Sequence, residues 1–406
     1  MFRRIILIIS LGVCVSVLSA KQIIPIQTGI PFFFSPNTTL RMAAVGDIIV
    51  HKNQFLAARN DTDGSFDFYP QLQLAKPLIE PVDFAIANLE TTLPGKDYEF
   101  FPRFGTPDNL AVALKKTGFD FLTHANNHVL DYGKDGVLRT LKVVDNLGFL
   151  HTGAFANRSE YNEKRIQVIE RQGIRFVILN YTYGTNGRPT PKGIVINRID
   201  RKKIADDIWL ARQKKVDFII VSYHFGVQYE RLPNQEQKDL VDFTFKEGVD
   251  VILGAHPHVV QPYVYKPVTD KYGVRKKRLV AYSLANFISN QRERYRDGGM
   301  VLYFNLRKTQ LEDGSIEREV EAVSDVPVWV YTAEKNKKHE FHIVALPQYF
   351  EKKFPHTLSK WNEFKLKRFY ADYRELMHPT AKLLVQRETV AKLENSSSSK
   401  KSSTKN

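Results

Sequence analysis

Carboxylate, amide and imidazole side chains recur in this chain directly after apolar runs that are predicted to be strands. Three of the clusters lie in the first half of the sequence: Val45-Gly-Asp47, Ala87-Asn-Leu-Glu90 and Ala125-Asn-Asn-His128. Proteins of the α/β class bind ligands at the carboxyl ends of their strands, so these side chains can meet in one site. A lone Gly-Asp also caps helices, and a hydrogen-bonded loop also explains an Asn-Asn-His.

Two further clusters, in the second half, carry histidines: Tyr223-His-Phe-Gly226 and Gly254-Ala-His-Pro-His258. Alternate residues of a strand share one face, so His256 and His258 can direct their imidazoles to one point. Loop histidines also serve purely structural roles. The single cysteine, Cys14, lies in the N-terminal apolar run. If that run is removed, a metal must be held by oxygen and imidazole nitrogen.

The elements that would position these residues alternate between strand and helix after a connector at residues 24–37. Strands are predicted at 40–45, 83–88, 119–123, 165–170, 174–181, 218–223 and 249–253. Helices are predicted at 72–79, 107–116, 134–147, 204–213 and 235–246. Antiparallel strands joined by charged turns follow at 258–265, 278–283, 300–306 and 317–323. The pattern predicts a sheet-containing α/β core, then β elements and a basic, mainly helical C-terminal segment.

The order of the polar clusters (aspartate, acid, Asn-His, His, then His-x-His) resembles that of the calcineurin-like metallophosphoesterases. Longer strings resemble the CapA/PgsA family of poly-γ-glutamate capsule proteins, which shares that fold: Phe104-Gly-Thr-Pro107, Gly118-Phe-Asp-Phe-Leu-Thr-His-Ala-Asn-Asn-His-Val-Leu-Asp-Tyr-Gly133, His224-Phe-Gly226, Gly254-Ala-His-Pro-His258 and Tyr282-Ser-Leu-Ala-Asn-Phe287. The resemblance covers about residues 40–304.

This resemblance implies an α/β, calcineurin-like metallophosphoesterase fold, with a layered αββα-type β-sheet core flanked by helices. The CapA-like domain is expected over residues 38–325 and a C-terminal helical extension over 326–394. The Ser/Lys tail at 395–406 is too polar to pack into a core.

The resemblance also implies a role for each polar residue of the strings. Two divalent metal ions are expected to be held by six oxygen and imidazole ligands: Asp47, Glu90, Asn127, His224, His256 and His258. Mixed ligands of this kind suit Mn, Fe or Zn better than Ca. Two ions about 3.5–4 Å apart clamp an oxyanion and lower the pKa of a bridging water. His128 is the expected catalytic residue: it faces the scissile group without being a ligand, and it can protonate a leaving group near neutral pH.

The sequence departs from the phosphoesterase pattern at two positions. Ile49 occupies the place of the histidine of an Asp-x-His motif, and His51 follows two residues later. His51 is therefore a candidate metal ligand, with an ordinary position beside the site as the alternative. Glu90 is longer than the expected bridging aspartate, so one metal position could be weak or empty. Asn286 is a candidate substrate-binding residue, although packing and turn formation explain it equally well.

The N-terminus indicates export. Residues 1–4 form a short basic start, and the apolar run at 5–18 is shorter than the roughly 20 residues that a spanning helix prefers. Residues 1–20 are therefore predicted to be a signal peptide, with the mature chain beginning near Lys21, or an uncleaved signal anchor. Both alternatives place the protein outside the cytoplasm: periplasmic, secreted or membrane-anchored.

The composition narrows the choice of partners. A chain of 406 residues with 43% hydrophobic and 25% charged residues is an ordinary globular protein. Its net charge of +15 favours polyanions, either an anionic capsule polymer or acidic lipids. Nucleic acid is not expected, because no zinc-finger, RRM-like or helix-turn-helix pattern occurs in the sequence. The basic residues are scattered, so a solvated surface explains them as well.

Three functions are consistent with the sequence. The first is metal-dependent hydrolysis of a phosphoester or a γ-glutamyl polymer, in contact with membrane-bound capsule synthesis components. The second is a non-catalytic role in capsule polymer assembly or export that keeps the metal-site fold. The third is a polyanion-binding surface module. The polar clusters favour the first over the third, and the question of whether the protein is an enzyme stays open between the first and the second.

Overall fold

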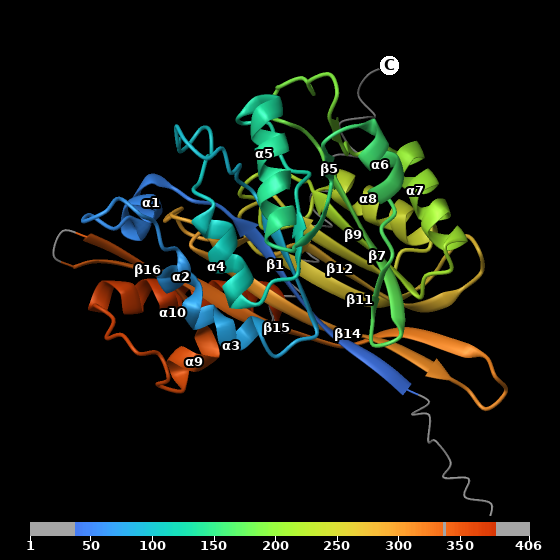
Figure 1. Cartoon of the computed structure of the whole chain (residues 1–406). Coiled ribbons are helices and arrows are strands. Elements are labelled where there is room, and N and C mark those ends of the chain that lie inside the picture. The colour runs from blue at the N-terminus through green and yellow to red at the C-terminus, as the bar shows by residue number, and fades with distance from the viewer. Residues whose placement is uncertain (1–36, 336–337, 379–406) are drawn as a thin grey trace, which may run out of the picture. The chain divides into compact units, whose positions relative to one another are not determined.

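The computed structural model describes residues 37–335 and 338–378 (Figure 1). The predicted signal segment at 1–20 and the predicted tail at 395–406 lie outside the described residues. Among the helices that the structure describes, none combines the length and the apolar composition needed to span a membrane.

Two large β-sheets organise the described part of the chain. The first has the strand order β16-β15-β14-β1-β2-β3-β4, with β13 beside β1, and the second has the order β11-β12-β10-β9-β7-β6. The first sheet contains β1 (Asn37–Ile48), β2 (Phe84–Leu89), β3 (Phe121–Thr123), β4 (Leu150–Thr152), β13 (Asn286–Ile288), β14 (Gly298–Gln310), β15 (Ile316–Lys335) and β16 (Lys338–Ala345). The second contains β6 (Ile169–Arg171), β7 (Ile174–Thr182), β9 (Phe218–His224), β10 (Val251–Ala255), β11 (Gln261–Thr269) and β12 (Arg275–Ser283). The short strands β5 (Ala154–Phe155) and β8 (Val195–Ile196) form a separate pair.

Helices cover the outer face of each sheet, as the ribbon in Figure 1 shows. On the first sheet lie α1 (Lys52–Ala58), α2 (Tyr69–Leu72), the 3-10 turn Gln73–Ala75, α3 (Lys76–Ile79), α4 (Asn109–Thr117) and α5 (Gly133–Asn146). On the second lie α7 (Arg201–Gln213) and α8 (Gln235–Lys246). The remaining helices are α6 (Arg158–Lys164), α9 (Leu346–Phe350) and α10 (Lys360–Met377).

The alternation of side chains along the strands builds the layers. In β1, Met42 and Ala44 face the second sheet, whereas Ala43 and Val45 face the helices. Strands β9 and β10 pair in parallel and are buried on both faces, which explains their largely apolar sequences. The predicted layered α/β core flanked by helices is therefore confirmed.

Three local predictions need correction. The strand expected at 165–170 is reduced to β6, because the chain leaves α6 in a turn and becomes strand only at Ile169. The helix expected over 72–79 is divided into three short pieces, and Pro77 stands in the first turn of the last piece. Proline has no backbone N–H, so it starts a helix more readily than it continues one. The strand expected at 278–283 was assigned to an antiparallel group, but β12 pairs antiparallel only with β11 and runs parallel to β10.

The C-terminal segment belongs to the same body of structure. The expected boundary between residues 325 and 326 lies inside β15, which pairs with β14 on one side and β16 on the other. The expected extension therefore begins as sheet, and its helical part is α9 and α10. Helix α10 buries Leu366, Phe369 and Leu376 in the core between the two sheets.

Candidate metal centre

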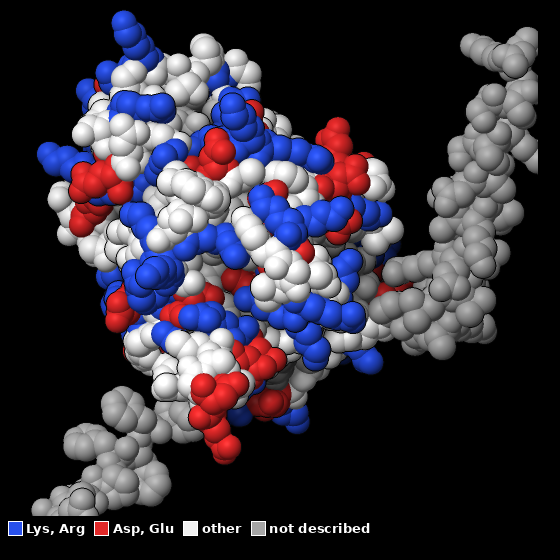
Figure 2. Space-filling model, turned by 90° about the vertical axis from the view of Figure 1, so that its right-hand side faces the viewer, with Lys and Arg blue, Asp and Glu red and all other residues white. Residues whose placement is uncertain are grey.

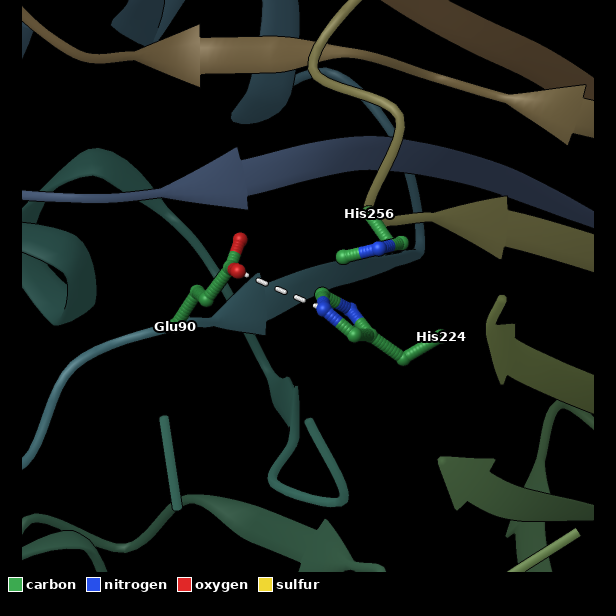
Figure 3. Close-up of side chains that lie close together, drawn as sticks. All are labelled: Glu90, His224 and His256. Atoms are coloured by element: carbon green, nitrogen blue, oxygen red, sulfur yellow. Dashed lines mark ion pairs between the residues drawn. The ribbon is translucent and has the colours of Figure 1, made fainter. Parts of the chain in front are cut away.

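The six expected metal ligands come together where strands of the two sheets end. The first sheet contributes Asp47 from β1, Glu90 from the residue after β2, and Asn127 from the loop after β3. The second contributes His224, the last residue of β9, together with His256 and His258 from the loop after β10. All six are buried. Figure 3 shows Glu90 facing His224, with the ring of His256 beside them.

Backbone conformation explains how the residues reach this point. Gly46 lies against Ala285, the residue before β13, and a Cβ atom at Gly46 would stand 1.9 Å from the carbonyl oxygen of Ala285. His256 and His258 have positive φ angles of 101° and 58°. Non-glycine residues in this region are strained and cluster at functional sites. The two imidazoles are therefore brought together by a turn after β10 ends at Ala255, rather than by alternation along a strand as the sequence predicted.

Two overlapping groups of three residues can each surround a cation. One group is Glu90, His224 and His256, and the other is Asp47, Glu90 and His258. Within each group the candidate ligand atoms lie within 4.8 Å of one another. Glu90 belongs to both groups, which is the position of a ligand that bridges two ions.

The distances between the ligand atoms fit this arrangement. His224 Nε2 lies 3.3 Å from Glu90 Oε1 and 2.8 Å from Asn127 Oδ1. His258 Nδ1 lies 3.1 Å from Asp47 Oδ2. Ligand atoms that are each about 2.1 Å from one ion lie roughly 3 Å from each other. Asn127 Oδ1 is therefore close enough to His224 to join the first group.

The electrostatics of the site also call for a cation. Glu90 is fully buried, and neither of its carboxylate oxygens accepts a hydrogen bond from any residue in the described ranges. Burial, followed by the neighbouring charge of Asp47, raises the pKa of Glu90 well above its ordinary value. A buried carboxylate that accepts no hydrogen bond is costly, so it either takes up a proton or binds a cation. The donor set and this unsatisfied carboxylate together fit divalent metal ions.

The imidazoles are in the state that metal binding requires. Burial, followed by the charge of His258, lowers the pKa of His256 to about 3, and burial lowers the pKa of His224 well below its ordinary value. Nδ1 of His256 has no hydrogen-bond partner among the described residues. Neutral imidazoles keep a lone pair for a metal, so these histidines are available as ligands at neutral pH.

His128 lies beside the ligand groups and belongs to neither. Its Nδ1–H donates to Asp131 Oδ2 at 2.7 Å, and the same oxygen accepts the backbone N–H of Phe104 at 2.7 Å. The Phe104 ring meets the His128 ring edge-on, with centroids 4.7 Å apart. The Asp131 carboxylate and the Phe104 ring fix the orientation of the imidazole. Since Nδ1 makes the hydrogen bond to Asp131, Nε2 remains for proton transfer.

The model of the family described as "Bacterial capsule synthesis protein PGA_cap" matches residues 41–291. The chain belongs to this family. The capsule biosynthesis protein CapA of Bacillus anthracis is 26% identical over 286 residues, which cover 66% of this chain and 64% of that protein. The PGA biosynthesis protein CapA of Bacillus subtilis (strain 168) is 26% identical over 273 residues, which cover 65% of this chain and 67% of that protein. The match thus spans less than two thirds of the length of the B. anthracis protein.

Solved structures with a similar chain path include two enzymes. The calcineurin-like phosphoesterase YfkN from Bacillus subtilis is 14% identical, with a TM-score of 0.45, and the alignment covers 83% of this chain and 98% of that one. The NAD nucleotidase NadN of Haemophilus influenzae is 10% identical, with a TM-score of 0.45, and the alignment covers 83% of this chain and 60% of that one.

His51, expected as a ligand in this capsule synthesis family member, belongs to neither ligand group. It is the N-cap residue of α1, and its backbone N–H donates to Gln54 Oε1 at 2.9 Å. Its Nδ1 accepts the backbone N–H of Asn290 at 3.2 Å. His51 packs edge-on against Phe104, which also contacts His128, so it has the ordinary position beside the site that was its alternative.

Asn286 is expected to touch substrate, but it is fully buried. Its side-chain amide donates to the carbonyl oxygen of Arg296 at 2.8 Å, and its Oδ1 lies 3.1 Å from His258 Nδ1. Strand β13 pairs with β1 so that Asn286 stands opposite Asp47. Asn286 therefore packs against His258 inside the protein, which agrees with the alternative explanation by packing.

Three neighbours of the site were not predicted to take part in it. Asn88 donates from Nδ2 to Asp47 Oδ1 at 2.8 Å. The ring of Tyr183 lies 4.5 Å from that of His256, and Asn186 Oδ1 accepts the side-chain N–H of Asn127 at 3.2 Å. Tyr183 and Asn186 follow a predicted strand, now β7, in the same way as the other clusters, so the same rule would have identified them.

Proposed function

We propose that this member of the capsule synthesis family is a hydrolase that depends on two divalent ions of the Mn, Fe or Zn type. The observation that carries the proposal is the position of Glu90 in both three-residue ligand groups. A carboxylate has two oxygens and can bind one ion with each. The remaining oxygen, amide and imidazole ligands match the preference of these transition metals.

When bound, a pair of divalent ions supplies a Lewis acid and an activated water for attack on a phosphoryl or carbonyl centre. The chain itself supplies the proton. His128, held by Asp131 at 2.7 Å, keeps one orientation and can deliver a proton from Nε2 to the leaving group. Asn186 Oδ1 accepts the side-chain N–H of Asn127 at 3.2 Å, and this hydrogen bond helps to fix the loop that carries both Asn127 and His128.

The substrate in this proposal is a phosphoester or a γ-glutamyl polymer. The B. subtilis relative is named a PGA biosynthesis protein, and both candidate substrates are anionic. The net charge of +15 favours anionic partners. On the face shown in Figure 2, Lys and Arg side chains are spread between acidic and uncharged ones, so attraction to a polyanion would be distributed over the surface. Membrane-bound capsule synthesis components are the proposed partners.

Metal analysis and activity assays on the same protein preparation test this function. This metal centre is expected to hold two equivalents of metal, and the protein is expected to hydrolyse a nitrophenyl phosphoester, a γ-glutamyl anilide or poly-γ-glutamate. His256→Ala should lose both metal and activity, while the exposed control His378→Ala should keep both. Metal bound at full occupancy without turnover of any of the three substrates would contradict catalysis and favour a role in polymer assembly or export.

The proposed location is outside the cytoplasm, on the strength of the basic start and apolar run at residues 1–20. Cell fractionation followed by N-terminal sequencing tests it. A chain beginning near Lys21, or an intact chain in the membrane fraction, supports export. An intact chain beginning at Met1 in the cytosol would contradict it.

A further inference from the structure

A second cluster of metal-binding side chains lies on the edge strand of the first sheet. Glu340 and His342 come from β16, and His356 comes from the segment between α9 and α10. One candidate ligand atom from each residue lies within 4.8 Å of the other two. Strands β15 and β14 separate β16 from β1, a distance of about 14 Å at the usual strand spacing. The cluster is therefore separate from the metal centre.

His342 is oriented in the way that metal-binding histidines are. Its Nδ1–H donates to the backbone carbonyl oxygen of Pro70 at 3.0 Å, which fixes the ring and leaves Nε2 with its lone pair. Histidine ligands commonly donate their second ring N–H to a carbonyl or carboxylate in this manner. Glu340 is two residues away on the same strand, so its side chain projects from the same face.

His356 is held against His342 by aromatic stacking. The two imidazole rings are stacked with centroids 4.3 Å apart. Tyr331, which stands opposite His342 in the pairing of β15 with β16, stacks on both rings at 5.9 Å and 6.0 Å. The sheet therefore keeps both imidazoles beside the Glu340 carboxylate, and the His356 ring has to turn out of the stack for the two in-plane lone pairs to reach one ion.

We propose that Glu340, His342 and His356 bind one zinc-type transition-metal ion. Two imidazoles and one carboxylate form a common zinc ligand set, which leaves a fourth position for water. Water can enter from the adjoining groove of about 920 Å³, whose lining includes Asp61, Pro70 and all three ligands. The ion joins the segment that precedes α10 to the edge of the sheet, and so secures the C-terminal helix in its place against the core.

Zinc titration of the full chain, with any affinity tag removed, tests the stoichiometry. His356→Phe is the decisive variant, because a phenyl ring can keep the stack on His342 and Tyr331 but cannot bind metal. It is expected to bind one equivalent of zinc fewer than the wild type. Adding it to a His256→Ala protein should remove the same equivalent, which separates this site from the proposed catalytic centre. Glu340→Gln is the second variant, should His356→Phe fold poorly.

Limited trypsin digestion tests the role of the ion. Lys352 and Lys353 are exposed in the segment that would be joined to the sheet. Zinc is expected to slow cleavage after these lysines several-fold in the wild type and to have no effect in His356→Phe. Equal zinc binding by the wild type and both variants would overturn the proposal, as would cleavage that zinc does not change in the wild type.

Discussion

Replacing Glu90 by glutamine should have opposite effects on stability with and without metal. In the metal-free protein the Glu90 carboxylate is fully buried and its oxygens accept no hydrogen bond from the described residues. Glutamine has the same shape and no charge, so Glu90→Gln should remove a desolvation cost of about 1–3 kcal/mol. With roughly 340 described residues and about 2.1 cal/mol/K of unfolding entropy per residue, this raises Tm by roughly 1.5–4 °C.

Metal should reverse that order. At a free metal concentration about 100-fold above Kd, each occupied site stabilises the wild type by about 2.7 kcal/mol, or roughly 4 °C. Glu90→Gln lacks the carboxylate shared by both ligand groups and should lose most of this gain. The wild type is therefore expected to be the less stable protein in chelator and the more stable one in Mn²⁺ or Zn²⁺.

The pH dependence of the stability of the metal-free protein provides a second test of the buried Glu90 carboxylate. Burial raises the pKa of Glu90 in the metal-free native state. In the unfolded chain Glu90 has its ordinary pKa of 4.5, so above pH 4.5 the unfolded chain releases a proton that the native state still binds. This contribution to stability is present below pH 4.5 and is lost as the pH rises toward the raised native pKa. Because glutamine does not titrate, the stability of Glu90→Gln should not show this decrease as the pH rises.

Thermal unfolding in chelator and in metal, repeated from acidic to neutral pH, measures both effects. The exposed Glu312, in the turn between β14 and β15, provides the control substitution Glu312→Gln, which should change neither curve. If Glu90→Gln were less stable than the wild type in chelator at neutral pH, Glu90 would be a structural hydrogen-bonding residue and the reasoning from its unsatisfied carboxylate would be wrong.

The other predictions concern the roles of single residues. His128→Ala should retain metal but lose turnover by about 10²–10⁴-fold, because a proton donor is removed rather than a ligand; loss of metal as well would assign it to bracing the loop through Asp131. His51→Ala should leave the metal content unchanged, since its ring contacts Gln54 and the backbone of residue 290; elemental analysis that shows one ion lost would restore it as a ligand. Asn286→Ala should weaken metal binding by about 10–100-fold, because the orientation of His258 is lost; a chelator competition assay that gives unchanged affinity would refute this.

The fold of the core could be predicted because its parallel strands are short and apolar and end in polar residues. The run that ends at Asp47 and the run before Glu90 are recognisable without any knowledge of their partners. The C-terminal boundary of the core domain could not be predicted. The first half of β15, which pairs with β14, carries charged residues such as Arg318 and Glu319. Half-solvated strands of this kind resemble surface turns in sequence.

The convergence of the six candidate residues could be predicted from the sequence, and the surroundings of the site less well. The order of the polar clusters identified six residues that do converge. The sequence around His224 does not indicate that this residue of the second sheet faces Glu90 of the first. The surroundings depend on long-range pairing. Asn286 lies next to His258 because the three-residue strand β13 pairs with β1, and no sequence period encodes that contact. Sequence alone left open whether His51 is a ligand or lies beside the site, because its closeness in sequence to Asp47 does not show that its Nδ1 accepts the backbone N–H of Asn290.

Anomalous diffraction from crystals grown with Mn²⁺ tests the bridging position of Glu90 most directly. Two manganese peaks about 3.5–4 Å apart, one on each side of the Glu90 carboxylate, are the predicted result. One of them should be bound by His224 and His256 and the other by Asp47 and His258. A single peak, or a pair of peaks that Glu90 does not join, would contradict the two-metal centre.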